Sequence, residues 1–261
     1  MARRYSLNSV LFSRRACLTG AAALLVAGSP RESSASATAF EPRGLRLRQD
    51  DAGCDASVLA TISRELERRT SAAVVREPSV IEPASASVLA SPFLFAGGTG
   101  TIDPLSEAAQ RQLQTFFSLG GLLVVDDRDR TSNTTAYAKS VEHSLASVLP
   151  DAGIIHLTAD HVLFRSFYLL GRIVGAKGSS TTVRAMARGN RIDVIFCSHD
   201  LSSALATRAS RWALAMDESE RELAVRFAVN LAMYSLCSTY KDDQVHAPFL
   251  MRRRAGKGFP R

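Results

Sequence analysis

A run of four apolar residues, Leu122 to Val125, follows directly on Gly120-Gly121 and leads into Asp126-Asp127. Because every position of the run is apolar, the strand that it predicts must be covered on both faces. A strand with one solvated face would alternate polar and apolar residues instead. The run therefore predicts a parallel sheet with helices on both sides, and the two glycines predict the end of a preceding helix.

The rest of the chain alternates between helical and strand periodicity. Val58, Leu59, Ile62 and Leu66, for example, recur at the spacing of one helix face, with Asp55 as the predicted cap. In chain order we predict a strand at 45–49, a helix at 55–70, strands at 73–76 and 92–96, a helix from Asp103 to the glycines, the strand at 122–125, a helix at 137–149, a strand at 153–157, two strands within 182–197, and a helix at 218–236.

Residues 182–197 interrupt this alternation. Two β-rich runs are separated by Arg188-Gly189-Asn190, which is typical of a hairpin, so we expect an antiparallel pair at one edge of the sheet. The fold class expected is α/β, doubly wound, with a mostly parallel sheet. The predicted organisation is a signal peptide at 1–37, a linker at 38–44, one α/β domain at 45–250 and a basic C-terminal tail at 251–261.

The N-terminal segment has the three parts of a bacterial export signal. Arg14-Arg15 precede the short apolar stretch from Gly20 to Gly28, and Ala35-Ser36-Ala37 is a small-residue cleavage site. Adjacent arginines favour the twin-arginine route, but Cys17 and Thr19 depart from its usual motif, so the general route stays open. The apolar stretch is too short for a membrane anchor. We expect a periplasmic or otherwise exported bacterial protein, with no transmembrane segment after signal cleavage.

The formal charge of +7 is concentrated at the two ends of the chain. Residues 1–37 carry +4 and residues 251–261 carry +5, which leaves −2 for the body between them. A basic face for nucleic acid is therefore not expected. The basic tail either contacts an anionic membrane surface or a protein partner at the membrane, or is simply a solvated end.

Three cysteines follow the predicted signal, namely Cys54, Cys197 and Cys237. An odd number allows at most one disulfide, and the pairing is open. Cys197 lies in an apolar run and Cys237 in an amphipathic helix, so we expect both in the core. The cysteine spacing has no metal-site pattern and the chain has no cofactor motif, so we predict no metal and leave the cofactor unknown.

Four blocks of the sequence resemble the bacterial family called domain of unknown function 4159 (DUF4159). They are PFLFAGG at 92–98, GGLLVVDD at 120–127, DHVLF at 160–164, and NLAMY at 230–234 followed by YKDDQVH at 240–246. The closing segment YKDDQVH is the specific part of the resemblance. The resemblance implies a flavodoxin-like sheet related to class I glutamine amidotransferases and to trehalose-utilisation-like proteins, and it implies no established reaction. Relatives often form part of larger membrane proteins with von Willebrand-type domains, which implies a protein partner at the membrane.

The implied relation to amidotransferases predicts where a catalytic cysteine would stand in this chain. In those enzymes a cysteine stands on a tight turn after a buried strand, and Asp126 holds that position here. A carboxylate cannot replace a thiolate in glutamine hydrolysis. Cys197 is followed by Ser198-His199-Asp200 and not by a glycine-flanked turn. Glutaminase activity is therefore not expected, while other enzyme activity stays open.

Polar residues follow several predicted strands, and ligands of open α/β sheets bind at the carboxyl ends of the strands. Gly98 and Gly100 either cradle an anion or form a plain turn. Asp126 and Asp127 either bind a ligand or act as acid and base, or Asp127 caps the next loop and the pair is matched by nearby arginines.

Two histidines stand beside carboxylates, in the pairs Asp160-His161 and His199-Asp200. Each pair offers either a ligand or acid–base site, or a structural histidine. The candidate ligand-binding residues are therefore Gly98, Gly100, Asp126, Asp127, Asp160, His161, His199 and Asp200.

A second polar group, consisting of Tyr240, Lys241, Asp243 and His246, follows the predicted final helix. We expect it to form a structural latch, because polar side chains there would satisfy the last carbonyls of the helix. Two functions remain open. One is a non-catalytic ligand- or partner-binding domain outside the cytoplasmic membrane. The alternative is a hydrolase of unknown substrate that uses Asp and His residues at the carboxyl edge of the sheet.

Overall fold

The computed structural model describes residues 39–48, 56–129, 135–207 and 216–255, and after Cys237 it describes the backbone alone. Contacts divide the chain into Met1–Ala37 and Thr38–Arg261, and the fold described below belongs to the second unit. Within the described ranges, the helices are too short or too polar to span a membrane.

Seven strands form the main sheet. In spatial order they are β2 (Val80–Ile81), β1 (Arg43–Leu45), β3 (Phe93–Gly98), β4 (Leu122–Asp127), β9 (Arg191–Cys197), β8 (Thr182–Arg188) and β5 (Gly153–Thr158). The first five are parallel, and β8 and β5 are each antiparallel to the preceding strand. The order is flavodoxin-like, which confirms the predicted α/β fold with an antiparallel edge.

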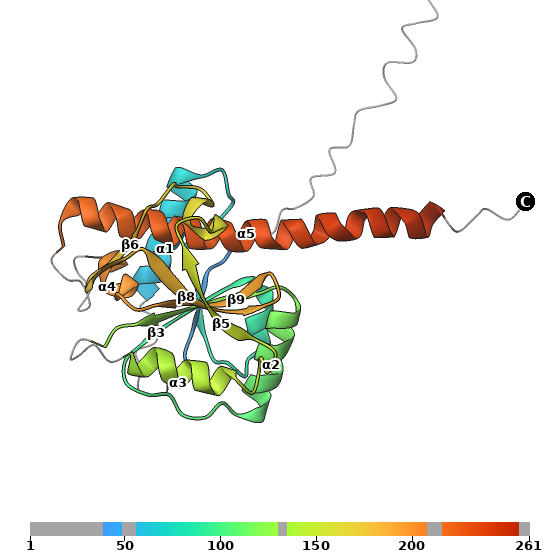
Figure 1. Ribbon diagram of the computed structural model, residues 1–261, viewed down its shortest axis with the longest axis horizontal. Helices are drawn as coiled ribbons and strands as arrows, with labels where there is room; N and C mark the ends of the chain where they lie inside the picture. Colours follow the sequence, from blue (N-terminus) through green and yellow to red (C-terminus); the bar gives the residue numbers. More distant parts are fainter. Residues whose placement is uncertain (1–38, 49–55, 130–134, 208–215, 256–261) are drawn as a thin grey trace, which may run out of the picture. The chain divides into compact units, whose positions relative to one another are not determined.

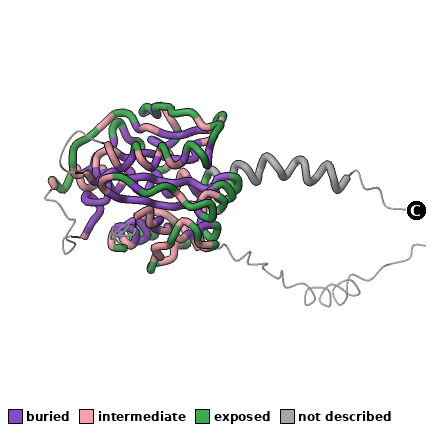
Figure 2. The backbone as a smooth tube through the Cα atoms, turned by 90° about the horizontal axis from the view of Figure 1, so that it is seen from below, coloured by how far each residue is buried: buried purple, intermediate pink, exposed green. Residues whose placement is uncertain are grey.

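The central strand β4 is buried at all of its positions. Leu122 and Val124 pack in the core on one face of the sheet, and Leu123 and Val125 pack in the core on the other. Figure 2 shows the buried backbone concentrated in the body of the fold. The prediction that this run is covered on both faces is therefore confirmed.

Helices cover the two faces, as Figure 1 shows. The first core holds residues of α1 (Ala56–Arg69), α4 (Leu201–Leu205), α5 (Glu218–Ala255) and the 3-10 turn η2 (Val162–Arg165). The second core holds residues of α2 (Glu107–Ser118), α3 (Ala136–Leu145) and the 3-10 turn η1 (Ala86–Ala90). A short antiparallel hairpin, β6 (Ile173–Gly175) and β7 (Gly178–Ser180), lies outside the main sheet.

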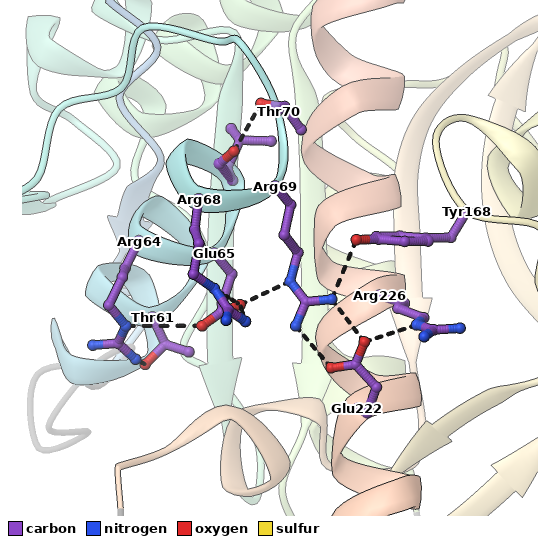
Figure 3. Close-up of polar contacts among 10 residues, drawn as sticks. Thr61, Arg64, Glu65, Arg68, Arg69, Thr70, Tyr168, Glu222 and Arg226 are labelled. Carbon is purple, nitrogen blue, oxygen red and sulfur yellow. Dashed lines mark hydrogen bonds and ion pairs between the residues drawn. The ribbon is translucent and has the colours of Figure 1, made fainter.

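Polar contacts join α5 to its neighbours. Figure 3 shows Glu222 of α5 between Arg69 of α1 and Arg226. One turn beyond Arg226, the buried amide of Asn230 accepts the N–H groups of Phe167 and Tyr168 and donates to the carbonyls of Leu163 and Tyr168. These contacts fix the segment after η2 against α5.

Several boundaries differ from those predicted. Helix α2 begins after Ser106 and not at Asp103, because the Ser106 hydroxyl accepts the N–H of Ala109 and caps the helix there. The predicted strand at 73–76 is reduced to one bridge between Phe40 and Val74, inside a segment that Pro78 soon ends.

The first strand also differs from its prediction. It occupies Arg43–Leu45 and not 45–49, because its unpredicted partner β2 is followed by Pro83, which cannot extend the pairing. Phe40, in the predicted linker, is buried.

Helix α5 continues to Ala255, well past the predicted end at residue 236. Neither glycine nor proline interrupts it between residue 236 and Pro248, which itself lies within the helix. Tyr240, Lys241, Asp243 and His246 therefore belong to this helix and do not follow it. Their side chains lie outside the described part of the chain, as does the rest of the predicted tail after residue 255. Helix α4 and the β6–β7 hairpin were not predicted.

Candidate functional site

Three of the candidate loops meet at the carboxyl edge of the sheet. Strand register pairs Gly98 of β3 with Asp127 of β4, and Asp126 with Cys197 of β9. The loops that begin at residues 99, 128 and 198 therefore leave the sheet side by side. The carboxylates themselves do not face solvent, since Asp126 is 0 % and Asp127 is 1 % exposed.

Asp126 binds the start of helix α4. Its two carboxylate oxygens accept the N–H groups of Leu201, at 2.9 Å, and Ser202, at 2.7 Å. Burial, together with the neighbouring carboxylate of Asp200, raises the pKa of Asp126 to about 6. The residue thereby ties the end of β4 to the loop that follows β9.

Asp200 turns the chain into the same helix. Its backbone is left-handed, with φ of 56°, a conformation that Asp tolerates better than most residues. The side chain is buried and accepts the N–H of Ser203 at 3.0 Å. Within the described residues the ring of His199 makes no hydrogen bond to it, so the two do not form an imidazole–carboxylate pair.

Asp127 caps the next helix. Its oxygens accept the N–H groups of Asp129, at 2.9 Å, and of Ala138 in the first turn of α3, at 3.2 Å. The adjacent Arg128 is also buried, and its backbone N–H donates to the carbonyl of Gly98. Asp127 therefore positions α3 against the sheet.

Gly98 is the last residue of β3, and Gly100 lies in the turn that follows. Gly100 has φ of +69°, and a Cβ added there would lie 2.9 Å from Nη1 of Arg48. The same Arg48 atom donates to the carbonyl of Thr99 at 2.8 Å, which closes the turn from the side of β1.

The order of the strands reverses between β1 and β3, and a cavity of about 220 Å³ lies at the carboxyl ends there. Its lining mixes both signs of charge, because Arg46 and Arg48 are accompanied by Glu82 and Asp103. Arg46 pairs with Glu82 at 3.0 Å. The charges around this cavity are therefore largely matched.

Asp160 and His161 lie apart from these loops. His161 caps η2, where its Nδ1 accepts the N–H of Leu163 at 3.2 Å, and its ring packs 6.0 Å from that of Tyr234 on α5. Burial and the charge of Arg165 lower the pKa of His161. Asp160 is fully exposed, 3.6 Å from Arg165. The structure therefore does not bring this pair together with Asp126.

A second cavity, of about 190 Å³, contains His199. Its other lining residues are His156, Ile173, Ser180, Thr182, Arg184, Phe196 and Ser198. Only His199 was a sequence candidate. Two of the other residues could have been found from the alternation of side chains along β8, which places Thr182 and Arg184 on the same face of the strand.

The β6–β7 hairpin closes one side of this cavity. The N–H groups of Ala176 and Lys177 donate to the carbonyls of Asp200 and His199, and Lys177 Nζ reaches the carbonyl of Asp127 at 3.2 Å. Burial and the charge of Lys177 lower the pKa of His199. The hairpin thus joins the loops after β4 and β9.

Cys197 is buried and carries a free thiol, whose pKa is raised well above its usual range by burial and by Asp126. A thiol in this state is a poor nucleophile. Cys237 is exposed, which corrects the expectation that it lies in the core, because α5 turns that position away from its buried stripe. Cys54 lies outside the described residues. In the described ranges, no three His, Cys, Asp or Glu residues are grouped so as to hold a metal ion.

Comparison with known proteins identifies the family of the chain. No curated protein matches the chain significantly. The family model described as "Domain of unknown function (DUF4159)" matches residues 45–236, which include every strand of the sheet except part of β1. The chain belongs to this family of domains of unknown function, DUF4159.

Proposed function

We propose that this protein is an exported, non-catalytic α/β domain that binds a ligand or partner at the carboxyl edge of its sheet. One observation carries the proposal. The carboxylates of Asp126, Asp127 and Asp200 are buried and accept backbone N–H groups of helices α3 and α4. A general base or nucleophile must direct a lone pair at its substrate. These carboxylates instead fix the loops at the carboxyl edge of the sheet. Loops that are already ordered lose less conformational entropy when a ligand binds.

A hydrolase is the alternative, and the pKa of Asp126 supports it. A carboxyl that titrates near pH 6 beside a second carboxyl is a frequent feature of acid–base sites. Burial alone accounts for the direction of this shift, however. Asp126 lines neither of the two cavities described at this edge, so neither cavity gives a substrate access to its carboxylate. These two points favour the binding role.

Export is supported by the sequence. Arg14-Arg15, the apolar stretch after them and the small residues at 35–37 are the parts of a signal. Replacement of both arginines by lysine tests the route. Accumulation of the uncleaved precursor in the cytoplasm is expected. Normal export of that variant would indicate the general route, and a wild-type protein that stays cytoplasmic would contradict export.

The absence of catalysis is tested with the purified protein and its Asp126→Asn variant. Both are assayed against carboxylate esters, phosphate esters, glycosides and L-glutamine, with Glu107→Gln as a control at an exposed position that lines neither cavity. We expect no turnover above the uncatalysed rate for any of the three proteins. Turnover that Asp126→Asn abolishes and Glu107→Gln preserves would establish the hydrolase and contradict the non-catalytic role.

A further inference from the structure

We propose that the cavity between β5, β8, β9 and the β6–β7 hairpin binds a small oxyanion, of which phosphate is the simplest example. The inference rests on the proposed binding role and names the class of ligand. The site is built from His156, Arg184, Ser198 and His199, with the hydroxyls of Ser180 and Thr182 beside them.

Strand register assembles the centre of this site. His156 of β5 is paired with Arg184 of β8, and Arg184 is paired with Phe196 of β9. Directly paired residues lie on the same face of a sheet, so these three side chains form one row across the strands. The row ends beside Ser198 and His199, which follow β9 at the carboxyl edge.

Arg184 is held in place before any ligand arrives. Its guanidinium lies over the Phe196 ring, 5.5 Å from the centroid, and Nη2 bonds to Glu142 of α3 at 2.5 Å. A guanidinium has five N–H donors in a fixed plane, and the bond to Glu142 engages only one of its nitrogens. The remaining edge is therefore positioned for an oxyanion without further loss of side-chain freedom.

The other lining groups are suited to the same ligand. Among the residues that the structure describes, the side chains of His156, Ser198 and His199 make no hydrogen bond, so their donors and acceptors are available. Ser180 and Thr182 add two hydroxyls 3.4 Å apart. The cavity lining contains no carboxylate, unlike that of the cavity between β1 and β3.

The charges around the cavity favour an anion. Lys177 contributes a positive charge near His199, and Arg184 contributes a second, which Glu142 partly balances. The carboxylate of Asp200, which follows His199, is buried outside the cavity lining and accepts the N–H of Ser203. The cavity of about 190 Å³ is several times the ~30 Å³ that one water molecule occupies. It is smaller than the ~300 Å³ at which pockets for drug-sized ligands begin. A small ion with a few waters therefore fits better than a large organic molecule.

Histidine NMR of the full-length protein tests the site with inorganic phosphate as the probe. Phosphate should shift the ring resonances of His199 and His156 and leave those of His143 and His161 unchanged, since neither of the latter lines the cavity. Sodium chloride at matched ionic strength is the control for screening. Equal shifts with chloride, or no shift of His199 with phosphate, would overturn the proposal.

Two variants separate a binding role of Arg184 from a structural one. Arg184→Lys keeps the charge but loses the planar donor set, so phosphate binding should weaken about tenfold or more. Glu142→Gln removes the competing negative charge but keeps a side-chain oxygen that can accept a hydrogen bond from Arg184, so binding should become several-fold tighter. Arg111→Lys, in an exposed pair with Glu107, is the matched control. If Arg184→Lys does not fold, the gain by Glu142→Gln still decides, and its absence overturns the proposal.

A pH series with sulfate, whose charge is constant over the range, adds a readout that a structural role would not produce. His199 shares the cavity with Arg184 and His156 and lies near the charge of Lys177. Glu142 pairs with Arg184, and the carboxylate of Asp200 follows His199 in the chain. Affinity should rise as the pH falls and His199 becomes protonated, and bound sulfate should raise the pKa of His199 by offsetting the charge of Lys177.

The inference and the proposed function fail separately. Missing phosphate shifts overturn the oxyanion site and leave the non-catalytic role standing. Turnover of a phosphate ester that depends on Asp126, with phosphate binding intact, overturns the non-catalytic role alone.

Discussion

Glu222 of α5 binds Arg69 of α1 through both of its carboxylate oxygens, each 2.7 Å from a guanidinium nitrogen (Figure 3). The two residues are 153 positions apart in the sequence. Arg69 also bonds to Glu65 at 2.8 Å and to the hydroxyl of Tyr168 at 3.2 Å. The planar guanidinium therefore joins two helices and the segment after η2 on one face of the sheet.

Glu222→Gln should lower the free energy of unfolding near neutral pH by about 1 kcal/mol, the size expected for a partly buried, bidentate pair. Hydrogen bonding by Arg69 lowers the pKa of Glu222 from 4.5 to about 2 in the folded protein. Because the folded pKa is depressed, the contribution is present above 4.5 and is lost as the pH falls toward 2. Urea unfolding across this range measures the difference between the two proteins.

The control for this change is Glu107→Gln, which removes an exposed carboxylate 3.4 Å from Arg111. It should leave stability unchanged within error. Equal effects of the two substitutions, or a Glu222→Gln deficit that persists near pH 2, would show that the bidentate pair does not stabilise the fold.

The contribution of Asp126 to stability should have the opposite pH dependence to that of Glu222. Burial and Asp200 raise its pKa from 3.8 to about 6, so the folded state holds the proton more strongly than the unfolded chain does. Its contribution to stability therefore falls as the pH rises from about 4 to about 6, with a slope of at most about 1.4 kcal/mol per pH unit. Asp126→Asn should remove this slope and Asp103→Asn should keep it. Parallel stability curves for wild type and Asp126→Asn would contradict the assignment.

The sequence alone predicts the elements whose periodicity is local. The run Leu122–Val125 is apolar throughout, so a doubly covered parallel strand follows from the residues themselves. The positions of Gly98, Asp127 and Ser198 at one edge then follow from parallel pairing. The burial of Asp126 and Asp127 does not, because their N–H partners in α4 and α3 lie up to 76 positions away.

Asp160 and His161 show what local patterns leave out. They follow a strand, which favours the carboxyl edge, yet Asn230 binds the segment at 163–168 to α5 through four hydrogen bonds. The cavity around His199 was missed for a similar reason. It depends on the β6–β7 hairpin, whose strands of three residues are too short to give a periodic signal.

The two described cysteines should differ in reactivity. Cys197 is buried with a raised thiol pKa, while Cys237 is exposed on α5. Iodoacetamide should therefore modify Cys237 in the native protein and reach Cys197 only after denaturation. Mass spectrometry of tryptic peptides measures both sites at once. Labelling of Cys197 in the native protein at the same rate as Cys237 would contradict the burial of Cys197 and would support a nucleophilic thiol at that position.

The β6–β7 hairpin should be displaced by a single methyl group. A Cβ at Gly175 would lie 2.0 Å from the carbonyl oxygen of His199, a backbone atom that cannot rotate away, whereas a Cβ at Gly171 would meet nothing within 4 Å. Gly175→Ala should therefore cost about 1 to 3 kcal/mol of stability. It should also speed amide exchange at Ala176 and Lys177, whose N–H groups bind the His199 loop, while Gly171→Ala changes neither. If both variants keep the exchange rates of the wild type, the hairpin does not rest on this loop, and the cavity around His199 loses one of its walls.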